Sequence, residues 1–308
     1  MTGPAISLRG VVKTFGGRRA VDGLDLDIAP GTCVGLLGPN GAGKSTTMKL
    51  LTGQALADSG TLSVLGLELP RQSKLARSRM GVVPQDDNLD EDLTVGQAVE
   101  VFAALYRVPR SERSEAVDKA LAIATLQDRR RDSVKELSGG MRRRLLIGRA
   151  LVHSPEVLLL DEPTVGLDPQ VRSELWGLIS RLRDEGVTIL MSTHYIEEAE
   201  RLADDVAVMA LGRVVARGVP SELVAKHVGS EALEVHAPAA RLADITARAV
   251  AAGLPTRRTG ASLSVLRAET FSPVDVGATG PEVGVRRRAA VLEDVFVVLT
   301  GDTGEEVA

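Results

Sequence analysis

The stretch GPNGAGKST, residues 38–46, constrains the fold more than any other part of this chain. It matches the pattern G-x-x-x-x-G-K-[ST] in full. It stands between a short apolar run at residues 32–38 and a segment with helical periodicity that begins at Lys44. A strand, a glycine-rich loop and a helix in this order predict an α/β fold with a phosphate-binding loop. We expect backbone N–H groups of the loop to surround a β-phosphate and Lys44 to neutralise β- and γ-phosphate oxygens.

This loop supplies most of the nucleotide contacts that the sequence predicts. Ser45 is expected to ligate Mg²⁺, and Thr46 to help at the α-phosphate. Phe15, in KTFGG, is the aromatic side chain near the N-terminus that is suited to stack on adenine, although a place in the core is an equally good interpretation. The predicted contacts within the loop are Gly38, Pro39, Asn40, Gly41, Ala42, Gly43, Lys44, Ser45 and Thr46.

Two adjacent carboxylates end the apolar run VLLLDEP, residues 157–163. Ligands of open α/β sheets bind at the carboxyl ends of the strands. We expect Asp161 to hold Mg²⁺ through water and Glu162 to act as the general base that polarises the attacking water. The pair could instead be a solvated strand exit, but the phosphate-binding loop favours the catalytic interpretation.

A histidine and a glutamine follow two further strand patterns. His194 comes after VTILMS and is expected at the same sheet edge as Glu162, where a neutral imidazole can bond the γ-phosphate and fix the water. Gln85 follows a proline as the chain leaves a strand, and its amide can reach Mg²⁺ and the water. Taken singly, either residue could be a structural strand end. Their order relative to the loop and the acids makes them candidates for catalysis.

A second phosphate-binding pattern stands at LSGGMRRRLLIGRAL, residues 137–151, where a serine and two glycines run into a helix. Because the first loop already wraps one triphosphate, Ser138, Gly139 and Gly140 are best suited to the γ-phosphate of a facing copy. Asp168, in VGLDPQ, is expected where the two copies touch. ATP would then favour the closed pair, and hydrolysis would release it.

The remaining patterns divide the chain into a large domain and a small one. The large domain is predicted at residues 1–220, with a helical lobe at about 86–150, and the small one at residues 221–308. Composition shifts beyond Pro220 to segments typical of an α+β unit. The segments expected before it are antiparallel edge strands at 5–30, helices from 73 to 131, strand–helix units at 157–163 and 187–205, and a hairpin at 206–218 with its turn at Leu211 and Gly212.

Composition and charge exclude several classes of function. The net charge of −4 spreads over both signs and aromatic residues make up 2%, so no nucleic-acid surface is expected. The single cysteine, Cys33, cannot form an intrachain disulfide or a zinc site. No run approaches the roughly 20 apolar residues of a membrane span, and the N-terminus lacks an export signal. We expect a cytosolic chain that contacts a membrane only through a partner.

Together these motifs resemble those of the ATP-binding-cassette (ABC) superfamily over residues 5–220. GPNGAGKST looks like its Walker A loop, VLLLDE its Walker B strand, Gln85 its Q-loop, LSGGM its signature, VGLD its D-loop and STH its H-loop. The resemblance implies a P-loop NTPase with a mixed sheet core, an antiparallel edge subdomain, an inserted helical lobe and a small C-terminal α+β appendage. It also implies a head-to-tail dimer that encloses two ATP molecules, and a lobe that grips a membrane partner.

The segments GGMRRRL, PQDDNLD and VLEDVFVVLTG are similar to those of drug-resistance and nodulation-type exporter ATPases. That resemblance implies a peripheral subunit on the cytoplasmic side of the membrane, which drives a separate ABC-2-type permease for a drug-like, lipid or saccharide cargo. The partner cassette would be a second copy or a similar chain. Met141 replaces the usual glutamine of the signature and Phe15 the commoner tyrosine, and neither change should abolish nucleotide binding.

Two other functions compete. A soluble regulatory or translation-linked ABC protein would carry two cassettes or a long coiled coil, and the sequence contains neither. A P-loop kinase would leave LSGG and His194 without a role.

Overall fold

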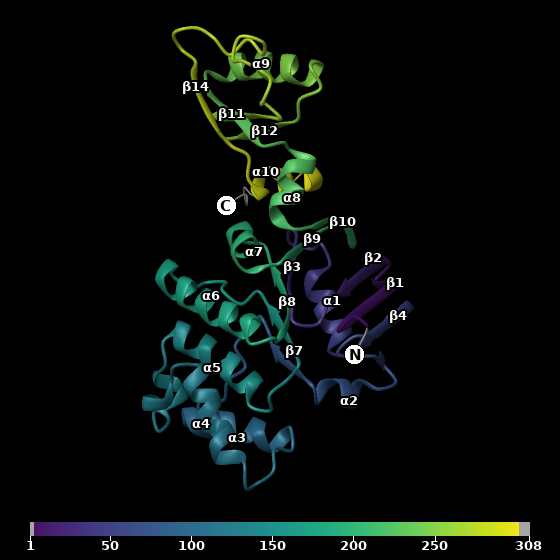
Figure 1. Cartoon of the computed structure of the whole chain (residues 1–308), viewed down its shortest axis with the longest axis vertical. Helices are drawn as coiled ribbons and strands as arrows, with labels where there is room; N and C mark the ends of the chain where they lie inside the picture. Colours follow the sequence, from purple (N-terminus) through teal and green to yellow (C-terminus); the bar gives the residue numbers. More distant parts are fainter. Residues whose placement is uncertain (1–2, 302–308) are drawn as a thin grey trace.

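The computed structural model describes residues 3–301 (Figure 1). Residues 1–2 and 302–308 of the two predicted domains lie outside this range. Seen in Figure 1, the large unit lies below and the C-terminal unit above, with helices α8 (Pro220–His227) and α10 (Leu292–Thr300) between them.

A six-stranded mixed sheet forms the centre of the large unit, in the order β10-β9-β3-β8-β7-β6. All neighbouring strands pair in parallel except β9 and β10, which form the predicted hairpin. This arrangement brings the carboxyl ends of the parallel strands to one edge. The strands are β3 (Cys33–Leu37), β6 (Met80–Val83), β7 (Val157–Asp161), β8 (Thr188–Thr193), β9 (Asp205–Ala210) and β10 (Arg213–Gly218).

The two faces of this sheet contribute to two different cores, because successive side chains of a strand point to opposite sides. Leu36 packs with helix α1 and the N-terminal strands, and Leu37 packs with the helices of the other face. Both side chains are fully buried. Among the helices that contribute to these cores are α1 (Lys44–Leu51), α5 (Gly139–Leu151), α6 (Pro169–Asp184) and α7 (Ile196–Leu202).

The N-terminal strands are antiparallel, as predicted. They form a separate four-stranded sheet in the order β2-β1-β4-β5. Ile6 and Leu8 share one core with Val34 and Leu36 of the main sheet, and helix α1 contacts strands of both sheets. The strands are β1 (Ile6–Phe15), β2 (Arg18–Ile28), β4 (Ser59–Val64) and β5 (Leu67–Leu69), followed by helix α2 (Ser73–Arg77).

The predicted helical lobe is inserted between β6 and β7. Helix α3 (Val95–Leu105) begins with a capping box between Thr94 and Gln97, and α4 (Arg113–Ile123) packs against it. Two 3₁₀ turns, Gln127–Arg129 and Val134–Glu136, lead to α5. Because α5 contacts both α3 and β6, it connects the lobe to the central sheet.

The C-terminal unit is an α+β appendage with a core of its own. Its antiparallel sheet has the order β12-β13-β11-β14 and packs against helix α9. Leu292 and Phe296 of α10 belong instead to the core of the large unit, so the division after residue 220 stays a prediction. The elements are α8 (Pro220–His227), β11 (Glu231–His236), α9 (Ala239–Ala251), β12 (Thr256–Thr259), β13 (Ser262–Leu266), β14 (Gly284–Ala289) and α10 (Leu292–Thr300).

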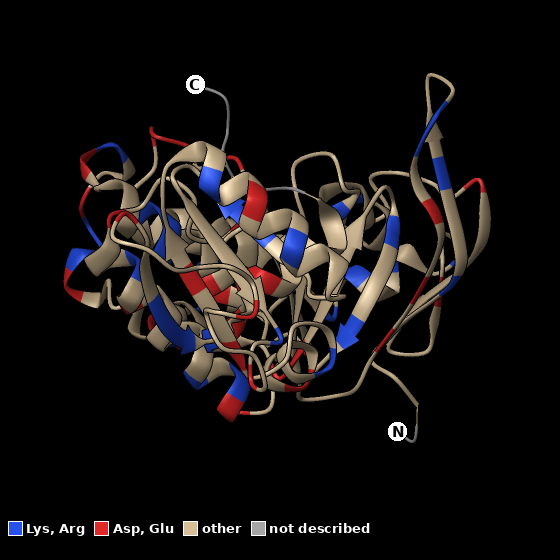
Figure 2. Cartoon of the chain, turned by 90° about the horizontal axis from the view of Figure 1, so that it is seen from above, with Lys and Arg blue, Asp and Glu red and all other residues tan. Residues whose placement is uncertain are grey.

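Charges of both signs are interspersed along these elements (Figure 2). Among the described residues, every helix is too short or too polar to cross a membrane.

Candidate active site

The phosphate-binding loop joins the end of β3 to the start of α1, at the sheet edge where the parallel strands end. Gly43, the residue before α1, has φ +107°, and a Cβ there would lie 2.4 Å from the carbonyl oxygen of Ala20. Only glycine fits this close approach. The first N–H groups of α1 have no intrahelical acceptor, because the first bond of this turn runs from the N–H of Thr47 to the Gly43 carbonyl. A loop of this construction fits an anionic phosphate.

Lys44 lies at the base of the loop with its side chain 4% exposed. Its ammonium donates to the carbonyl oxygens of Gly38, at 2.6 Å, and Pro39, at 3.1 Å. Burial lowers the pKa of Lys44 from its usual value, and the carboxylates of Glu162 and Asp161 partly oppose this shift. The Lys44 side chain therefore stabilises the loop through these two hydrogen bonds, and its positive charge lies beside the two acids.

A cavity of about 350 Å³ opens next to the loop. Phe15 lines it with its side chain 52% exposed, so the alternative that Phe15 is a core residue is wrong. The ammonium of Lys13 lies 5.1 Å from the centre of the Phe15 ring. The predicted site residues that line this cavity are Phe15, Asn40, Gly41, Gly43, Lys44, Ser45, Thr46, Gln85 and Glu162, whereas Gly38, Pro39 and Ala42 lie in the loop behind it.

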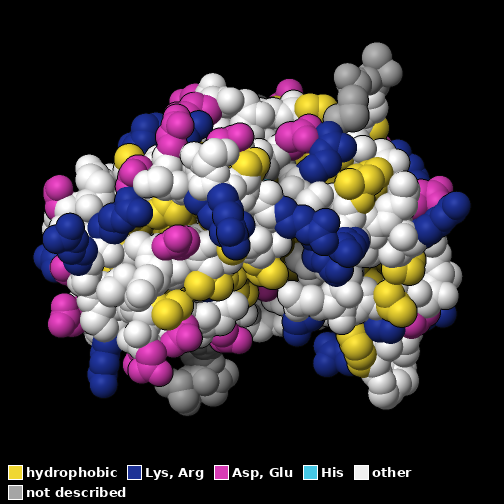
Figure 3. Space-filling model, turned by 90° about the horizontal axis from the view of Figure 1, so that it is seen from below, with side chains coloured by type: hydrophobic (Ala, Val, Ile, Leu, Met, Phe, Trp, Pro, Cys, Tyr) yellow, Lys and Arg dark blue, Asp and Glu magenta, His cyan; other side chains and the backbone are white. Residues whose placement is uncertain are grey.

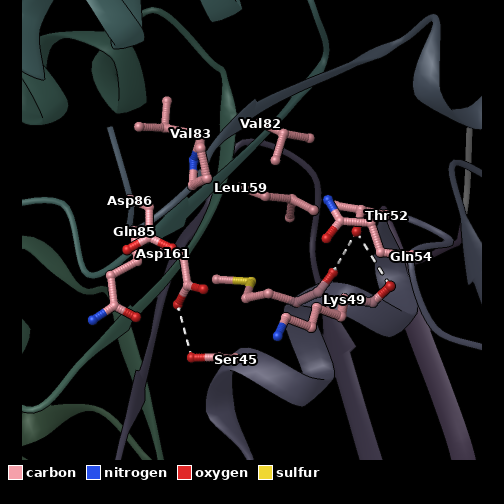
Figure 4. Close-up of a pocket in the computed structure, with 12 residues that line it drawn as sticks. Ser45, Lys49, Thr52, Gln54, Val82, Val83, Gln85, Asp86, Leu159 and Asp161 are labelled. Carbon is pink, nitrogen blue, oxygen red and sulfur yellow. Dashed lines mark hydrogen bonds between the residues drawn. The ribbon is translucent and has the colours of Figure 1, made fainter. Parts of the chain in front are cut away.

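Oxygen donors that suit Mg²⁺ meet beside this cavity. The hydroxyl of Ser45 donates to Oδ1 of Asp161 at 3.4 Å, and the side chain of Gln85 lies on the same side (Figure 4). These residues also line a smaller cavity of about 180 Å³ beside α1 and β6. The described part of the chain has no cluster of three or more His, Cys, Asp or Glu side chains suited to a metal. A magnesium ion would therefore need phosphate oxygens in addition to this donor set.

Glu162 is the centre of a buried polar cluster. Its side chain is 6% exposed, so the alternative of a solvated strand exit is wrong for this residue. Nε2 of Gln85 donates to its Oε2 at 3.3 Å, and Nδ1 of His194 lies 3.2 Å from its Oε1 without hydrogen-bond geometry. Gln85, Glu162 and His194, which the sequence predicted as one catalytic group, lie together.

The backbone of Glu162 is strained, with φ +46°. Its N–H donates to both the carbonyl oxygen and the hydroxyl of Ser192 on β8, each at 3.1 Å. The Ser192 hydroxyl also donates to Oδ1 of Asp161. Backbone strain of this kind costs about 1–3 kcal/mol and persists only where the surroundings impose it. Strand β8 thus fixes the direction in which both acids point.

The second phosphate-binding pattern forms the start of α5 and does not line the cavity of its own chain. Ser138 is the N-cap and accepts a hydrogen bond from the N–H of Met141 at 3.4 Å. Ser138 and Gly139 are exposed, and Gly140 is buried against Val171 of α6. Asp168 is an exposed N-cap of α6.

Sequence reasoning missed two residues that support the acids, Ser192 and Arg143. Ser192 stands in an apolar strand pattern, where a single small hydroxyl residue does not indicate a functional site. Arg143 is buried on α5 and donates to backbone carbonyls around the site. A signal for it existed, because it falls on the same helical face as the buried Gly140 and Ile147.

Comparison with known proteins agrees with this geometry. Residues 21–165 match the family described as ABC transporter. Along most of its length the chain resembles proteins called Nod factor export ATP-binding protein I. That of Ralstonia nicotianae is 41% identical, covering 97% of this chain and 94% of the relative, and that of Paraburkholderia xenovorans is 42% identical, covering 96% and 97%. The chain belongs to the ABC transporter family.

Solved ABC cassettes share its fold. The cassette cbiO1 of Clostridium perfringens, part of the ABC transporter complex cbiONQ, matches with a TM-score of 0.68 and 31% identity, covering 73% of this chain and 92% of that one. A dimeric cassette in a post-hydrolysis state, bound to ADP and Pi, matches with a TM-score of 0.62 and 27% identity, covering 70% and 98%.

The predicted P-loop ABC cassette is confirmed, and this chain is an ATP-binding, ATP-hydrolysing subunit of an ABC exporter. The relatives favour this class over a soluble regulatory ABC protein or a P-loop kinase.

Proposed function

We propose that two copies of this chain close head-to-tail, so that each ATP lies between the Lys44 loop of one copy and Ser138, Gly139 and Gly140 of the other. The observation that supports this most directly is the position of the α5 start. Ser138 and Gly139 are exposed and do not line the cavity of their own chain. A helix N-terminus directed at a triphosphate is electrostatically favourable, and closure of two copies would provide that contact.

In the closed dimer, Glu162 accepts the proton of the water that attacks the γ-phosphate. Gln85 orients the water and Glu162 through its side-chain amide, and His194 contacts the γ-phosphate. Ser45, Gln85 and Asp161 would hold Mg²⁺, which would neutralise phosphate charge when bound. Burial of Glu162 beside Lys44 supports this assignment, since a base excluded from bulk solvent acts on one positioned water.

We propose that the helical lobe is the part of the cassette that contacts a separate ABC-2-type permease. Its helix α3 exposes Val101 and Leu105, with exposed fractions of 52% and 68%. Figure 3 shows the end of the molecule where α3 and α4 lie, with exposed hydrophobic side chains among charges of both signs. Docking there would keep the cassette on the cytoplasmic side of the membrane as a peripheral subunit. The cargo would be drug-like, lipid or saccharide, in line with relatives named for Nod factor export.

Sharing of sites is tested by mixing two inactive variants. Ser138→Arg blocks the α5 start but keeps the Lys44 loop, and Lys44→Ala does the reverse. A mixed dimer contains one complete site, so mixing should restore ATPase activity. The control pairs Ser138→Arg with the double variant Ser138→Arg/Lys44→Ala, which cannot complete a site. Lack of rescue in mixed dimers shown to form would refute head-to-tail sharing.

The permease assignment has its own test. The chain should co-purify with the membrane protein encoded beside it, and its ATPase rate should respond to cargo. Replacing both Val101 and Leu105 by Ser should weaken co-purification and leave basal ATP hydrolysis unchanged. Co-purification of that variant at the level of the unmodified chain would place the permease elsewhere.

A further inference from the structure

Arg143 makes an unusually complete set of hydrogen bonds in the interior of the cassette. Its guanidinium donates to five carbonyl oxygens, those of Pro84, Gln85, Asp161, Glu162 and Pro163, at distances of 2.7, 3.2, 2.8, 2.9 and 2.7 Å respectively. A guanidinium has five N–H donors, so every donor is used. The residue is 8% exposed.

These five carbonyls belong to two segments that are far apart in the sequence. One segment leaves β6 and carries Gln85, and the other leaves β7 and carries Asp161 and Glu162. The side chains of Gln85 and Glu162 meet at 3.3 Å on the cavity side. Arg143 thus joins, through the backbone, the two segments whose side chains form the catalytic cluster.

Burying a charge is costly, and Arg143 offsets that cost by its hydrogen bonds to the backbone carbonyls of these two segments. Desolvation lowers the pKa of Arg143, with nearby acids opposing the shift. The neighbouring core positions of α5, Leu145, Leu146 and Ile147, are apolar and fully buried. An apolar residue would pack in this core but would leave the two loops without a shared donor. A lysine ammonium has three N–H donors and could bond at most three of these five carbonyls, whereas the planar guanidinium bonds all five.

Arg143 also lies little more than one turn after Ser138, on the same helix. A shift of α5 would therefore carry the Gln85 and Glu162 segments with it. We propose that Arg143 is a positioning residue, which holds the Gln85 and Glu162 segments in catalytic register and ties their placement to the start of α5. This inference rests on the proposed roles of Glu162 and Ser138.

The test compares Arg143→Lys and Arg143→Met with the matched control Arg144→Lys. Arg144 is the next residue of α5, but its side chain contacts Thr125 and Glu174, away from the cavity. Three measurements are made on the full chain: kcat and KM for ATP, thermal unfolding, and ATP-dependent dimer formation with Glu162→Gln added. A misplacement of about 1 Å can cost about 100-fold in rate.

We expect Arg143→Lys to lower kcat by roughly 10- to 100-fold with KM changed less than about threefold, and Arg143→Met to lower kcat further. Both should still dimerise with ATP when Glu162→Gln is added, and Arg144→Lys should match the unmodified chain. A kcat of Arg143→Lys within about twofold of the unmodified chain would overturn the proposal. Loss of ATP binding, or loss of the folded state in both variants, would also overturn the proposal, because Arg143 would then be a structural residue.

These outcomes are separable from failure of the proposed function. If Glu162→Gln alone retains turnover, or forms no dimer with ATP, the assigned base or the dimer is wrong. The split between kcat and KM in the Arg143 variants still reports on whether Arg143 positions the site.

Discussion

The ammonium of Lys44 lies 3.8 Å from Oε1 of Glu162, and both side chains are more than nine-tenths buried. One charge comes from the first residue of α1 and the other from the residue after β7. The group that we propose binds phosphate therefore lies beside the group that we propose activates water. Because the two come from different segments, substitutions should separate nucleotide binding from hydrolysis.

Replacing Glu162 by Gln should stop hydrolysis and preserve ATP binding. The amide has nearly the same shape but cannot accept the proton of the attacking water, and loss of a general base costs about 10²- to 10⁴-fold. Removal of its negative charge also leaves more of the Lys44 charge for the phosphates. Phosphate release should fall while size-exclusion chromatography with ATP shows a dimer. Turnover near that of the unmodified chain would mean that another group is the base.

Replacing Phe15 by Ala should weaken ATP binding without changing kcat. Phe15 is half-exposed at the cavity, and its expected role is to stack on adenine and not to take part in hydrolysis. Stacking of a base on an aromatic ring contributes about 1–3 kcal/mol, so Kd should rise roughly 5- to 150-fold. Phe15→Tyr, which keeps the ring, serves as the control. Equal affinity of the Ala and Tyr variants for ATP would exclude Phe15 from adenine binding.

The two glycines at the start of α5 should respond differently to Ala. A Cβ at Gly140 would lie 2.3 Å from Cγ1 of Val171, whereas a Cβ at Gly139 would meet no atom of the same chain within 4 Å. Gly140→Ala should therefore lower the free energy of unfolding by about 1–3 kcal/mol, since overpacking forces neighbours to shift.

Gly139→Ala should leave thermal unfolding unchanged but lower ATPase activity, because its methyl group would project toward the nucleotide of the facing copy. Unfolding and turnover measured side by side check both variants. Full activity in Gly139→Ala would argue that no ligand approaches this turn closely.

The sequence allowed the loop and the acid pair to be predicted because their signals are local. Residues 38–46 carry their own motif, and Glu162 directly follows an apolar run. The separate N-terminal sheet could not be predicted in this way. The alternating pattern around Ile6 and Leu8 is the same whether the strands pair with the main sheet or pack on its face. Arg143 was missed because it stands in a run of three arginines, a pattern that is typical of a solvent-exposed helix face.

The appendage is anchored by a buried carboxylate on α10, Asp294, whose side chain is fully buried. It accepts hydrogen bonds from Arg288 of β14, at 2.7 and 2.8 Å, and from Arg257 of β12, at 3.1 Å. Burial alone would raise the pKa of Asp294, but the hydrogen bonds from Arg288 and the N–H of Val291 bring it below its ordinary 3.8. A lowered pKa in the folded state means that this carboxylate stabilises the fold above pH 3.8, and that the contribution is lost as pH falls through the folded-state pKa.

Asp294→Asn should therefore destabilise the protein at pH 7 by about 3 kcal/mol, because it leaves two arginines without their buried partner. The thermal midpoint should fall by roughly 6 °C or more. The control is Glu293→Gln, which removes a half-exposed partner of the same Arg257 and should cost less than about 1 kcal/mol.

Thermal unfolding at pH 7, at pH 5 and below pH 4 checks the sign of the pH dependence. The gap between Asp294→Asn and the unmodified chain should be constant from pH 7 to pH 5 and shrink as the carboxylate is protonated in the folded chain. A gap that persists unchanged at the lowest pH would mean that packing, and not charge, anchors α10 to the appendage sheet.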